Sequence, residues 1–202
     1  MNFLQLPSPL WVLGTDTGVG KTHVAARIAR AWAGAGPVEY RKPFQTGVAS
    51  PEDAEADAPV VRGPGITVAT GLVLRAPLSP MAAAALEGRT LDLDALAAWT
   101  TRPPAPGTRL LLEAAGGVMV PLAPHRHFLA WASDFRIPCV VVARGGLGTL
   151  NHSLLTCEAL MIRGWTVAAL LLNPGLDGTG AAALDNAAVL RQLLPFPVHV
   201  LD

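Results

Sequence analysis

Gly14-Thr-Asp-Thr-Gly-Val-Gly-Lys-Thr22 decides the fold, because this glycine-bearing turn follows the apolar run Leu10–Leu13 and leads into a helical pattern that begins near Lys21. Successive backbone N–H groups in such a turn, together with the positive end of a helix, form a binding site for anionic oxygens. The sequence therefore predicts a phosphate-binding loop of a nucleoside triphosphate site, in which Lys21 reaches the outer phosphates and the Thr22 hydroxyl ligates Mg²⁺.

The loop departs from the strict phosphate-loop pattern at one position. That pattern places a glycine five residues before the glycine of Gly-Lys-Thr, and here this position holds Thr15, with Gly14 one residue earlier. A chance Gly-Lys-Thr at a strand–helix junction is the alternative interpretation. The apolar strand before the turn and the helical pattern after it favour phosphate binding.

Short apolar runs alternate with longer helical patterns along the rest of the chain. This alternation is typical of a parallel sheet covered by helices. We therefore expect an α/β fold in one domain over residues 1–202, a parallel sheet flanked by helices of the phosphate-loop NTPase type. Strands are expected at Leu10–Leu13, Val38–Arg41, Leu110–Leu112, Cys139–Ala143, Val167–Leu172 and Val198–Leu201. Helices are expected at Lys21–Ala33, Glu52–Val61, Pro80–Glu87, Leu93–Trp99, Thr149–Arg163 and Ala181–Leu194.

The composition argues against several classes of protein. The 202 residues carry 15 cationic and 15 anionic side chains, so nothing indicates a nucleic-acid-binding surface. The stretch Met1–Leu13 lacks a cationic start and is interrupted by Pro7 and Pro9, and no apolar run approaches the roughly 20 residues of a membrane span. Only Cys139 and Cys157 are present, which predicts buried free thiols in a reducing compartment. We expect a cytoplasmic enzyme without membrane or nucleic-acid partners.

A second polar cluster follows the second expected strand. In Tyr40-Arg-Lys-Pro-Phe-Gln-Thr-Gly47, Lys42 lies at the carboxyl end of a strand, where open α/β sheets bind their ligands. Pro43 and Gly47 predict a turn that holds Lys42 and Thr46 towards one crevice. A solvated lysine at the end of a strand is the alternative interpretation.

A carboxylate follows the third expected strand. In Leu110-Leu-Leu-Glu-Ala-Ala-Gly-Gly-Val-Met-Val-Pro-Leu122, Glu113 comes after three leucines and before a loop of small residues. A buried, unpaired carboxylate is costly, so an acid at this point needs a cation, and Mg²⁺ beside the phosphates is a natural partner. A hydrogen-bonded structural glutamate is the alternative interpretation.

In this order, the three segments resemble those of the dethiobiotin synthetase family, ATP-dependent carboxylases that close the cyclic urea of a biotin precursor. The phosphate loop carries the threonine that this family has at the position of Thr15. Tyr40–Gly47 is similar to the family's catalytic-lysine segment, and Leu112–Leu122 is similar to its Glu-Gly-Ala-Gly-Gly segment. Further similarity extends the resemblance approximately from Leu10 to Gly175, through Ser79-Pro80 to Glu87-Gly88, Leu147 to His152, and Leu172-Asn173.

The resemblance implies an enzyme that joins 7,8-diaminononanoate (7,8-diaminopelargonate) with CO₂ and ATP, giving dethiobiotin, ADP and phosphate. An amine takes up CO₂ as a carbamate, the carbamate oxygen attacks the γ-phosphate, and the second amine closes the ring. Lys21 and Lys42 would then be catalytic, since they neutralise charge during phosphoryl transfer. Thr46 and Asn151 are expected to bind the substrate. Asn151 opens a helix in a region that lies near the dimer interface in the family, so a homodimer is expected.

The resemblance also assigns the metal and the nucleotide contacts. Mg²⁺ is expected at Thr22, Asp57 and Glu113, with Asp53 as the rival of Asp57, and a merely solvated acidic helix face remains the alternative. Asn173 is expected to read the adenine edge through its amide, although it is also suited to an ordinary turn. The full set of expected nucleotide contacts is Thr17, Gly18, Val19, Gly20, Lys21, Thr22, His23, Asp57, Glu113, Ala114, Ala115, Gly116, Asn173 and Pro174.

The sequence departs from the family at two places. Ala114 stands where the family has glycine, and a backbone with positive φ there would cost the alanine about 1 kcal/mol or more. The family continues beyond the position of Asp202 with a strand, a turn and a helix that help to enclose the base, so nucleotide selectivity is expected to be affected.

Three other interpretations are open. An amidotransferase synthetase of the cobyrinate type usually carries a glutaminase domain, for which 202 residues leave no room. A partitioning-type nucleotide switch usually has a second lysine early in its loop, and Gly14-Thr-Asp-Thr17 has none. The third is an inactive relative that binds nucleotide.

Overall fold

The computed structural model describes residues 1–53, 56–176 and 180–201. Its main feature is a seven-stranded sheet with the order β3-β2-β4-β1-β7-β8-β9, in which all neighbouring strands are parallel. The strands are β1 Leu10–Gly14, β2 Val38–Thr46, β3 Ile66–Leu74, β4 Arg109–Glu113, β7 Cys139–Arg144, β8 Val167–Asn173 and β9 Val198–Val200. A separate antiparallel hairpin pairs β5 Pro121–Ala123 with β6 Arg126–His127.

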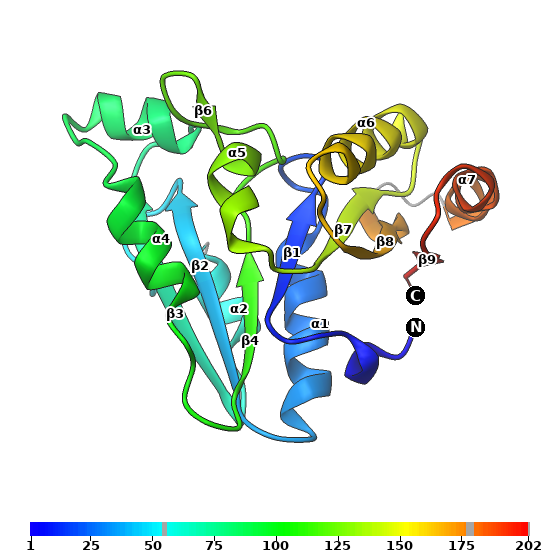
Figure 1. The fold of residues 1–202 in the computed structure, drawn as a ribbon, viewed down its shortest axis with the longest axis horizontal. Helices are drawn as coiled ribbons and strands as arrows, with labels where there is room; N and C mark the ends of the chain where they lie inside the picture. The colour runs from blue at the N-terminus through cyan, green and yellow to red at the C-terminus, as the bar shows by residue number, and fades with distance from the viewer. Residues whose placement is uncertain (54–55, 177–179, 202) are drawn as a thin grey trace.

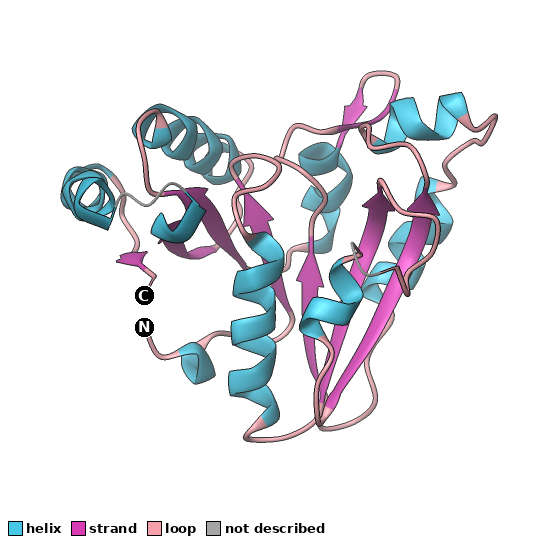
Figure 2. Cartoon of the chain, turned by 180° about the vertical axis from the view of Figure 1, so that it is seen from behind, coloured by secondary structure: helices cyan, strands magenta, loops and turns pink. Residues whose placement is uncertain are grey.

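Helices cover both faces of the sheet (Figures 1 and 2). One face carries α1 Lys21–Ala33 and α2 Asp57–Val61. The other carries α4 Leu93–Thr101, α5 Phe128–Ala132, α6 Thr149–Ile162 and α7 Gly180–Leu193, while α3 Pro80–Leu86 packs beside the hairpin. The short 3₁₀ turns are η1 Phe3–Gln5, η2 Ser133–Phe135 and η3 Pro174–Leu176. The arrangement confirms the predicted single-domain, phosphate-loop type of α/β fold. No helix among the described residues is both long and apolar enough to cross a membrane.

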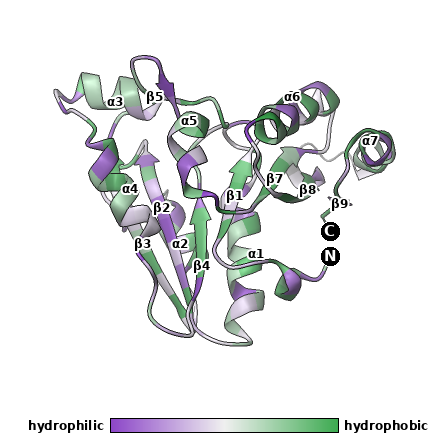
Figure 3. Ribbon diagram, in the orientation of Figure 1, coloured by the Kyte–Doolittle hydropathy of each residue, from purple (hydrophilic) through white to green (hydrophobic). Residues whose placement is uncertain are grey.

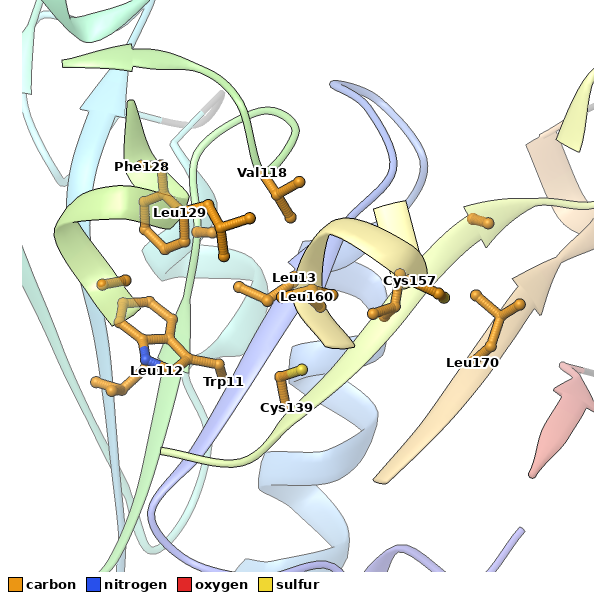
Figure 4. Packing of buried hydrophobic residues seen from close by; sticks show 14 of the residues in the cluster. Trp11, Leu13, Leu112, Val118, Phe128, Leu129, Cys139, Cys157, Leu160 and Leu170 are labelled. Carbon is orange, nitrogen blue, oxygen red and sulfur yellow. The ribbon is translucent and has the colours of Figure 1, made fainter. Parts of the chain in front are cut away.

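The central strand β1 contributes to two hydrophobic cores, one on each side of the sheet. Trp11 and Leu13 belong to the core under α5 and α6, whereas Leu10 and Val12 belong to the core under α1. Figure 4 shows Trp11 beside Phe128 of α5, and their rings meet edge to face with centroids 5.3 Å apart. Because side chains alternate along a strand, burial on both faces requires an unbroken apolar run, which explains why this strand is readable from the sequence.

Both cysteines are buried in the core that Figure 4 shows, on β7 and α6, and both are free thiols. Burial raises the pKa of both thiols, that of Cys157 to about 12. They are therefore structural side chains at neutral pH, as the sequence predicts for Cys139 and Cys157.

The turn predicted at Pro43 is wrong, because β2 continues through it to Thr46. Pairing of β2 with β4 ends at Arg41, whereas pairing with β3 continues to the end of β2. Beyond Arg41 the strand β2 pairs with β3 alone, and a proline, which lacks a backbone N–H, is tolerated where a strand has a partner on one side only. In consequence Lys42, one residue beyond the expected end of this strand at Arg41, lies within β2.

The sequence does not predict β3, the hairpin β5–β6 or the short helix α5. In β3, Thr67, Thr70 and Gly71 interrupt the apolar side chains, and several of its residues are half-buried. The strand lies at the edge of the sheet, next to β2 alone, so burial imposes no unbroken apolar run. In Figure 3 the central strands β1 and β4 are green, whereas β2, next to this edge, shows the purple of polar residues.

The helix expected over Glu52–Val61 begins only at Asp57. Before it, the Asp53 carboxylate accepts hydrogen bonds from the backbone N–H groups of Ala49 and Ser50, at 2.6 and 3.0 Å, which closes a turn. Aspartate competes for local backbone donors in this way, and the competition disfavours a helix. Ala54 and Glu55, within the expected helix, lie outside the described residues.

Arg41, next to Lys42 in β2, is a fully buried cation that holds the end of α4. Its Nε donates to the Glu39 carboxylate at 2.7 Å. Its Nη1 donates to three backbone oxygens in the last turn and cap of α4, those of Trp99, Thr100 and Arg102. A helix leaves its last carbonyls without intrahelical donors, so this guanidinium replaces them.

We expect Arg41→Met to destabilise the protein by about 3 kcal/mol or more, because it leaves the Glu39 carboxylate, 14% exposed, and several carbonyls of the α4 terminus without this donor. Urea unfolding followed by circular dichroism measures this change. Arg102→Met is the matched control, since the Arg102 side chain is 64% exposed and its Nη2 lies 3.7 Å from the same Glu39 carboxylate. The control is expected to change stability by about 0.5 kcal/mol or less. Equal stability of the two variants would contradict this role of Arg41.

Candidate functional site

The carboxyl ends of β1, β2 and β4 meet at one edge of the sheet, where a cavity of about 320 Å³ opens. Parallel sheets bind ligands at this edge. The cavity collects predicted site residues from segments far apart in the sequence. Its walls are formed by Thr17, Gly18, Gly20, Lys21, Thr22, Lys42, Phe44, Gln45, Thr46, Asp57, Glu113, Ala115 and Gly116.

The phosphate loop joins β1 to α1, and the side chain of Lys21 folds back along it. Lys21 Nζ donates to the backbone oxygen of Asp16 at 2.8 Å. A Cβ atom on Gly14 would lie 2.9 Å from Lys21 Cδ, so the glycine that stands one residue early in the motif leaves space for the lysine stem. Burial lowers the pKa of Lys21 to about 8, although the Glu113 carboxylate opposes this shift.

Glu113 is the centre of a buried hydrogen-bonded cluster. Its Oε1 accepts from Thr22 Oγ1 at 2.8 Å and from Lys42 Nζ at 2.9 Å. Its Oε2 accepts from the Tyr40 hydroxyl at 2.9 Å. Glu113 is fully buried, so its charge depends on these donors.

Lys42 bridges two carboxylates at the wall of the cavity. Its Nζ lies between Glu113 Oε1 and Asp57 Oδ2 and forms ion pairs with both. Burial alone would lower the pKa of Lys42, but the Glu113 and Asp57 carboxylates outweigh it and raise the pKa. Lys42 is therefore a fixed cation that faces the space above the phosphate loop.

The oxygens of Thr22, Asp57 and Glu113 gather around this point, as a divalent cation site requires. Over the residues that the structure describes, no three His, Cys, Asp or Glu side chains form a metal-binding group. The set here is two carboxylates and one hydroxyl. Mg²⁺ typically takes one or two carboxylates and completes its coordination with phosphate oxygens and water, so these residues fit it.

Asp57, and not its rival Asp53, lines the cavity. Asp57 begins α2, and its backbone N–H donates to Gln45 Oε1 at 3.3 Å, which ties this helix to β2. The Asp53 carboxylate is already engaged with the Ser50 and Ala49 backbone, and these hydrogen bonds lower its pKa. Asp53 is therefore a turn-forming residue.

Asn173 lies at the end of β8 against the phosphate loop. Its Nδ2 donates to the backbone oxygen of Val19 at 3.2 Å, and its Oδ1 accepts from the backbone N–H of Gly175 at 3.3 Å. Pro174 follows in η3. The amide thus links the loop to β8, and its role in reading adenine stays a prediction.

Comparison with known proteins places the chain in a family. Residues 9–198 match the AAA domain family. The ATP-dependent dethiobiotin synthetase BioD of Anaeromyxobacter sp. (strain Fw109-5) is 40% identical over 202 residues, which cover 96% of this chain and 91% of that protein. The chain belongs to the dethiobiotin synthetase family. The BioD of Methylobacterium nodulans is 38% identical over 221 residues, covering 96% of this chain and 98% of that protein.

Two further matches cover only part of the matched protein's length. The biotin biosynthesis bifunctional protein BioCD of Bordetella avium is 37% identical over 199 residues, and this chain covers 41% of its length. Chloroplast FtsY from Physcomitrella patens has a TM-score of 0.54 at 18% identity, covering 96% of this chain and 58% of that one, which supports the fold alone. The dethiobiotin synthetase relatives favour the ligase over a partitioning-type switch.

Ala114 departs from the dethiobiotin synthetase pattern without the strain that the sequence suggests. Within the described chain, the non-glycine residues with positive φ are His125 and Arg136, so the backbone of Ala114 is not in the left-handed region. The Ala114 N–H donates to the Val12 carbonyl at 3.1 Å, as in a regular continuation of β4. The left-handed turn comes later, at Gly116 with φ of 64°.

Several predicted contacts lie away from the cavity in this member of the dethiobiotin synthetase family. Asn151 is in the first turn of α6 and His23 is in the first turn of α1, and both are exposed. Val19 and Ala114 are buried behind the loops that line the cavity. Sequence reasoning missed Tyr40, although its position two residues before Lys42 places both side chains on the same face of β2.

A second cavity of about 390 Å³ adjoins the first and shares four of its lining residues, Thr17, Thr46, Ala115 and Gly116. Its other walls come from the segment that leads into α3 and from the loop after β4. They are largely apolar: Pro77, Leu78, Ser79, Pro80 and Val120. The site thus combines a cationic end beside the phosphate loop with an apolar extension.

Proposed function

We propose that this chain catalyses the ATP- and Mg²⁺-dependent carboxylation and ring closure of 7,8-diaminononanoate to dethiobiotin, with release of ADP and phosphate. The observation that carries the proposal is the position of Lys42. Its buried ammonium group lines the cavity beside the phosphate loop, and the largely apolar cavity adjoins that one. The family relatives, named ATP-dependent dethiobiotin synthetases, support the same activity.

The proposed reaction uses the two lysines to hold negative charge. One amine of the substrate forms a carbamate with CO₂, and a carbamate oxygen attacks the γ-phosphorus while ADP leaves. The second amine then attacks the carbonyl carbon of the mixed anhydride and expels phosphate. Lys42 would neutralise the carbamate, and Lys21 would neutralise the transferring phosphoryl group. Preorganised cations act in this way without reorganising during the reaction.

The nucleotide is proposed to bind along the loop from Thr17 to Thr22, with its phosphates on the backbone N–H groups before α1. Mg²⁺, held by Thr22, Asp57 and Glu113, would neutralise charge on the outer phosphates. Asn173 would contact the adenine from the end of β8. These assignments rest on the side-chain oxygens of Thr22, Asp57 and Glu113 around Lys42 and on the position of the loop.

The substrate is proposed to lie across both cavities. Its diamine end would meet Lys42 and Thr46, and its methylene chain would fill the apolar extension beside Pro77 and Val120. Asn151 does not line either cavity in one chain, so its role in holding the substrate carboxylate rests on the homodimer that we also propose. The proposed cytoplasmic location rests on the two free cysteines.

Isotope incorporation tests the reaction. Purified protein is incubated with 7,8-diaminononanoate, labelled bicarbonate, ATP and Mg²⁺, and labelled cyclic urea is measured beside ADP. We expect equal amounts of labelled dethiobiotin and ADP, formed only when all four components are present. ATP binding without any labelled product would contradict the proposal and would indicate another small ligase or an inactive relative.

A further inference from the structure

Tyr40 is buried directly behind Glu113. It lies in β2 opposite Leu111 of β4, and its ring packs in the core under α1. Its hydroxyl donates to Glu113 Oε2 at 2.9 Å, across 73 residues of sequence. Tyr40 does not line the cavity, whereas Glu113 does, so the phenol reaches the site only through this carboxylate.

The two oxygens of Glu113 face different surroundings. Oε2 faces the Tyr40 hydroxyl inside the sheet, and Oε1 faces Thr22 and Lys42 at the cavity. The terminal torsion of a glutamate is broad, so a carboxylate without a partner on Oε2 would turn more freely. A hydrogen bond to one oxygen therefore fixes the direction of the other, as partners behind metal-binding groups commonly do.

We propose that Tyr40 is a positioning residue, which holds Glu113 so that Oε1 faces Thr22, Lys42 and the metal–nucleotide complex. The inference rests on the proposed function, because it assigns Tyr40 to the site at which Mg²⁺ and ATP would bind. Tyr40 is fully buried and its hydroxyl donates to Glu113 Oε2, so it acts as a fixed hydrogen-bond donor.

A purely structural role for Tyr40 would have a different signature. The ring fills space in the core, and phenylalanine would fill the same space. Tyr40→Phe therefore removes the hydroxyl and leaves the packing. Thr100→Val is the matched control, because it removes another buried hydroxyl, which donates to Leu96 O at 2.7 Å within α4 and away from the cavity.

Calorimetric titration with ADP, in the presence and absence of Mg²⁺, distinguishes the two roles. In Tyr40→Phe we expect ADP affinity with Mg²⁺ to fall about tenfold or more, within the 10- to 100-fold range for losses behind a metal ligand. ADP affinity without Mg²⁺ is expected to stay within about twofold of wild type, since the loop itself is unchanged. Thr100→Val is expected to match wild type in both titrations.

A double-variant cycle with Glu113→Gln gives a second readout. If Tyr40 acts through Glu113, Tyr40→Phe adds no further loss of Mg²⁺-dependent affinity to the loss in Glu113→Gln. Independent, additive losses would overturn the proposal, as would wild-type Mg·ADP affinity in Tyr40→Phe. Equal losses with and without Mg²⁺ would also overturn it. These titrations need no diamine. A protein that forms no dethiobiotin would therefore contradict the proposed function, but it would not change what the titrations show about Tyr40.

Discussion

Replacement of Lys42 by methionine is expected to lower dethiobiotin formation by about a thousandfold. Methionine keeps an unbranched apolar stem and removes the charge that the proposed carbamate and phosphoryl group require. Loss of one preorganised donor at developing negative charge typically costs about 10²- to 10³-fold in rate. Steady-state formation of labelled product, measured at saturating ATP and diamine, gives the change in turnover.

The same replacement is also expected to destabilise the protein, because Lys42 is the shared partner of Glu113 and Asp57. Removing one member of a buried ion pair costs about 3–5 kcal/mol when the other charge remains buried. The Asp57 side chain is 24% exposed, whereas Glu113 is fully buried. Most of this loss of stability is therefore expected to come from the unpaired Glu113 carboxylate. Lys42→Met/Glu113→Gln removes both charges and is expected to recover stability without recovering turnover.

Arg62→Met is the matched control for the loss of a cation near α2. The Arg62 side chain is 51% exposed and forms its ion pair with Glu52 on the surface, at 2.9 Å. It is expected to keep wild-type turnover and stability within about 0.5 kcal/mol. A folded Lys42→Met protein that forms product at a rate within tenfold of wild type would contradict the catalytic role of Lys42.

The strands buried on both faces are the part of the fold that the sequence reveals best. In Leu10–Leu13 of β1 and Cys139–Ala143 of β7 every residue belongs to one of two cores, so the apolar run is continuous and its limits are clear. The helix Lys21–Ala33 is also predicted with the bounds that the structure has, because the phosphate loop fixes its start and Gly34 follows its end. The edge strand β3 lacks such a constraint and is not readable.

The limits of prediction at the site follow from the same physics. Lys21, Thr22 and the loop glycines are adjacent in sequence, so a local pattern reveals them. Tyr40 and Glu113 meet only because β2 and β4 pair, and no local pattern encodes that contact. Asp57 and Asp53 differ in their hydrogen bonds, and these depend on the path of the backbone before α2, which the sequence pattern does not give.

Replacement of Gly20 by alanine is expected to weaken ADP binding by about 100-fold, from two effects that act together. Gly20 caps α1 with φ of 94° and ψ of 25°, a left-handed conformation that costs other residues about 1–2 kcal/mol. A Cβ atom there would also lie 2.1 Å from Asn173 Nδ2, so the Asn173 side chain must move. Its hydrogen bond to the Val19 carbonyl would be lost, at a further cost of about 1 kcal/mol.

Gly107→Ala separates backbone strain from this collision. Gly107 has φ of 76° with open space around it, in the turn before β4, so alanine there meets the strain but no neighbour. It is expected to lower stability by about 1 kcal/mol and to leave ADP affinity unchanged. Gly20→Ala/Asn173→Ala removes the collision and keeps the strained cap. Asn173→Ala alone is the reference, because Asn173 is itself proposed to contact the adenine. If Gly20→Ala weakens ADP binding less in the Asn173→Ala background than in the wild type, the collision with Asn173 displaces the loop. If it weakens binding equally in both backgrounds, the conformation of the cap alone decides affinity, because the phosphate-binding N–H groups then depend on the left-handed backbone at Gly20 and not on the amide behind it.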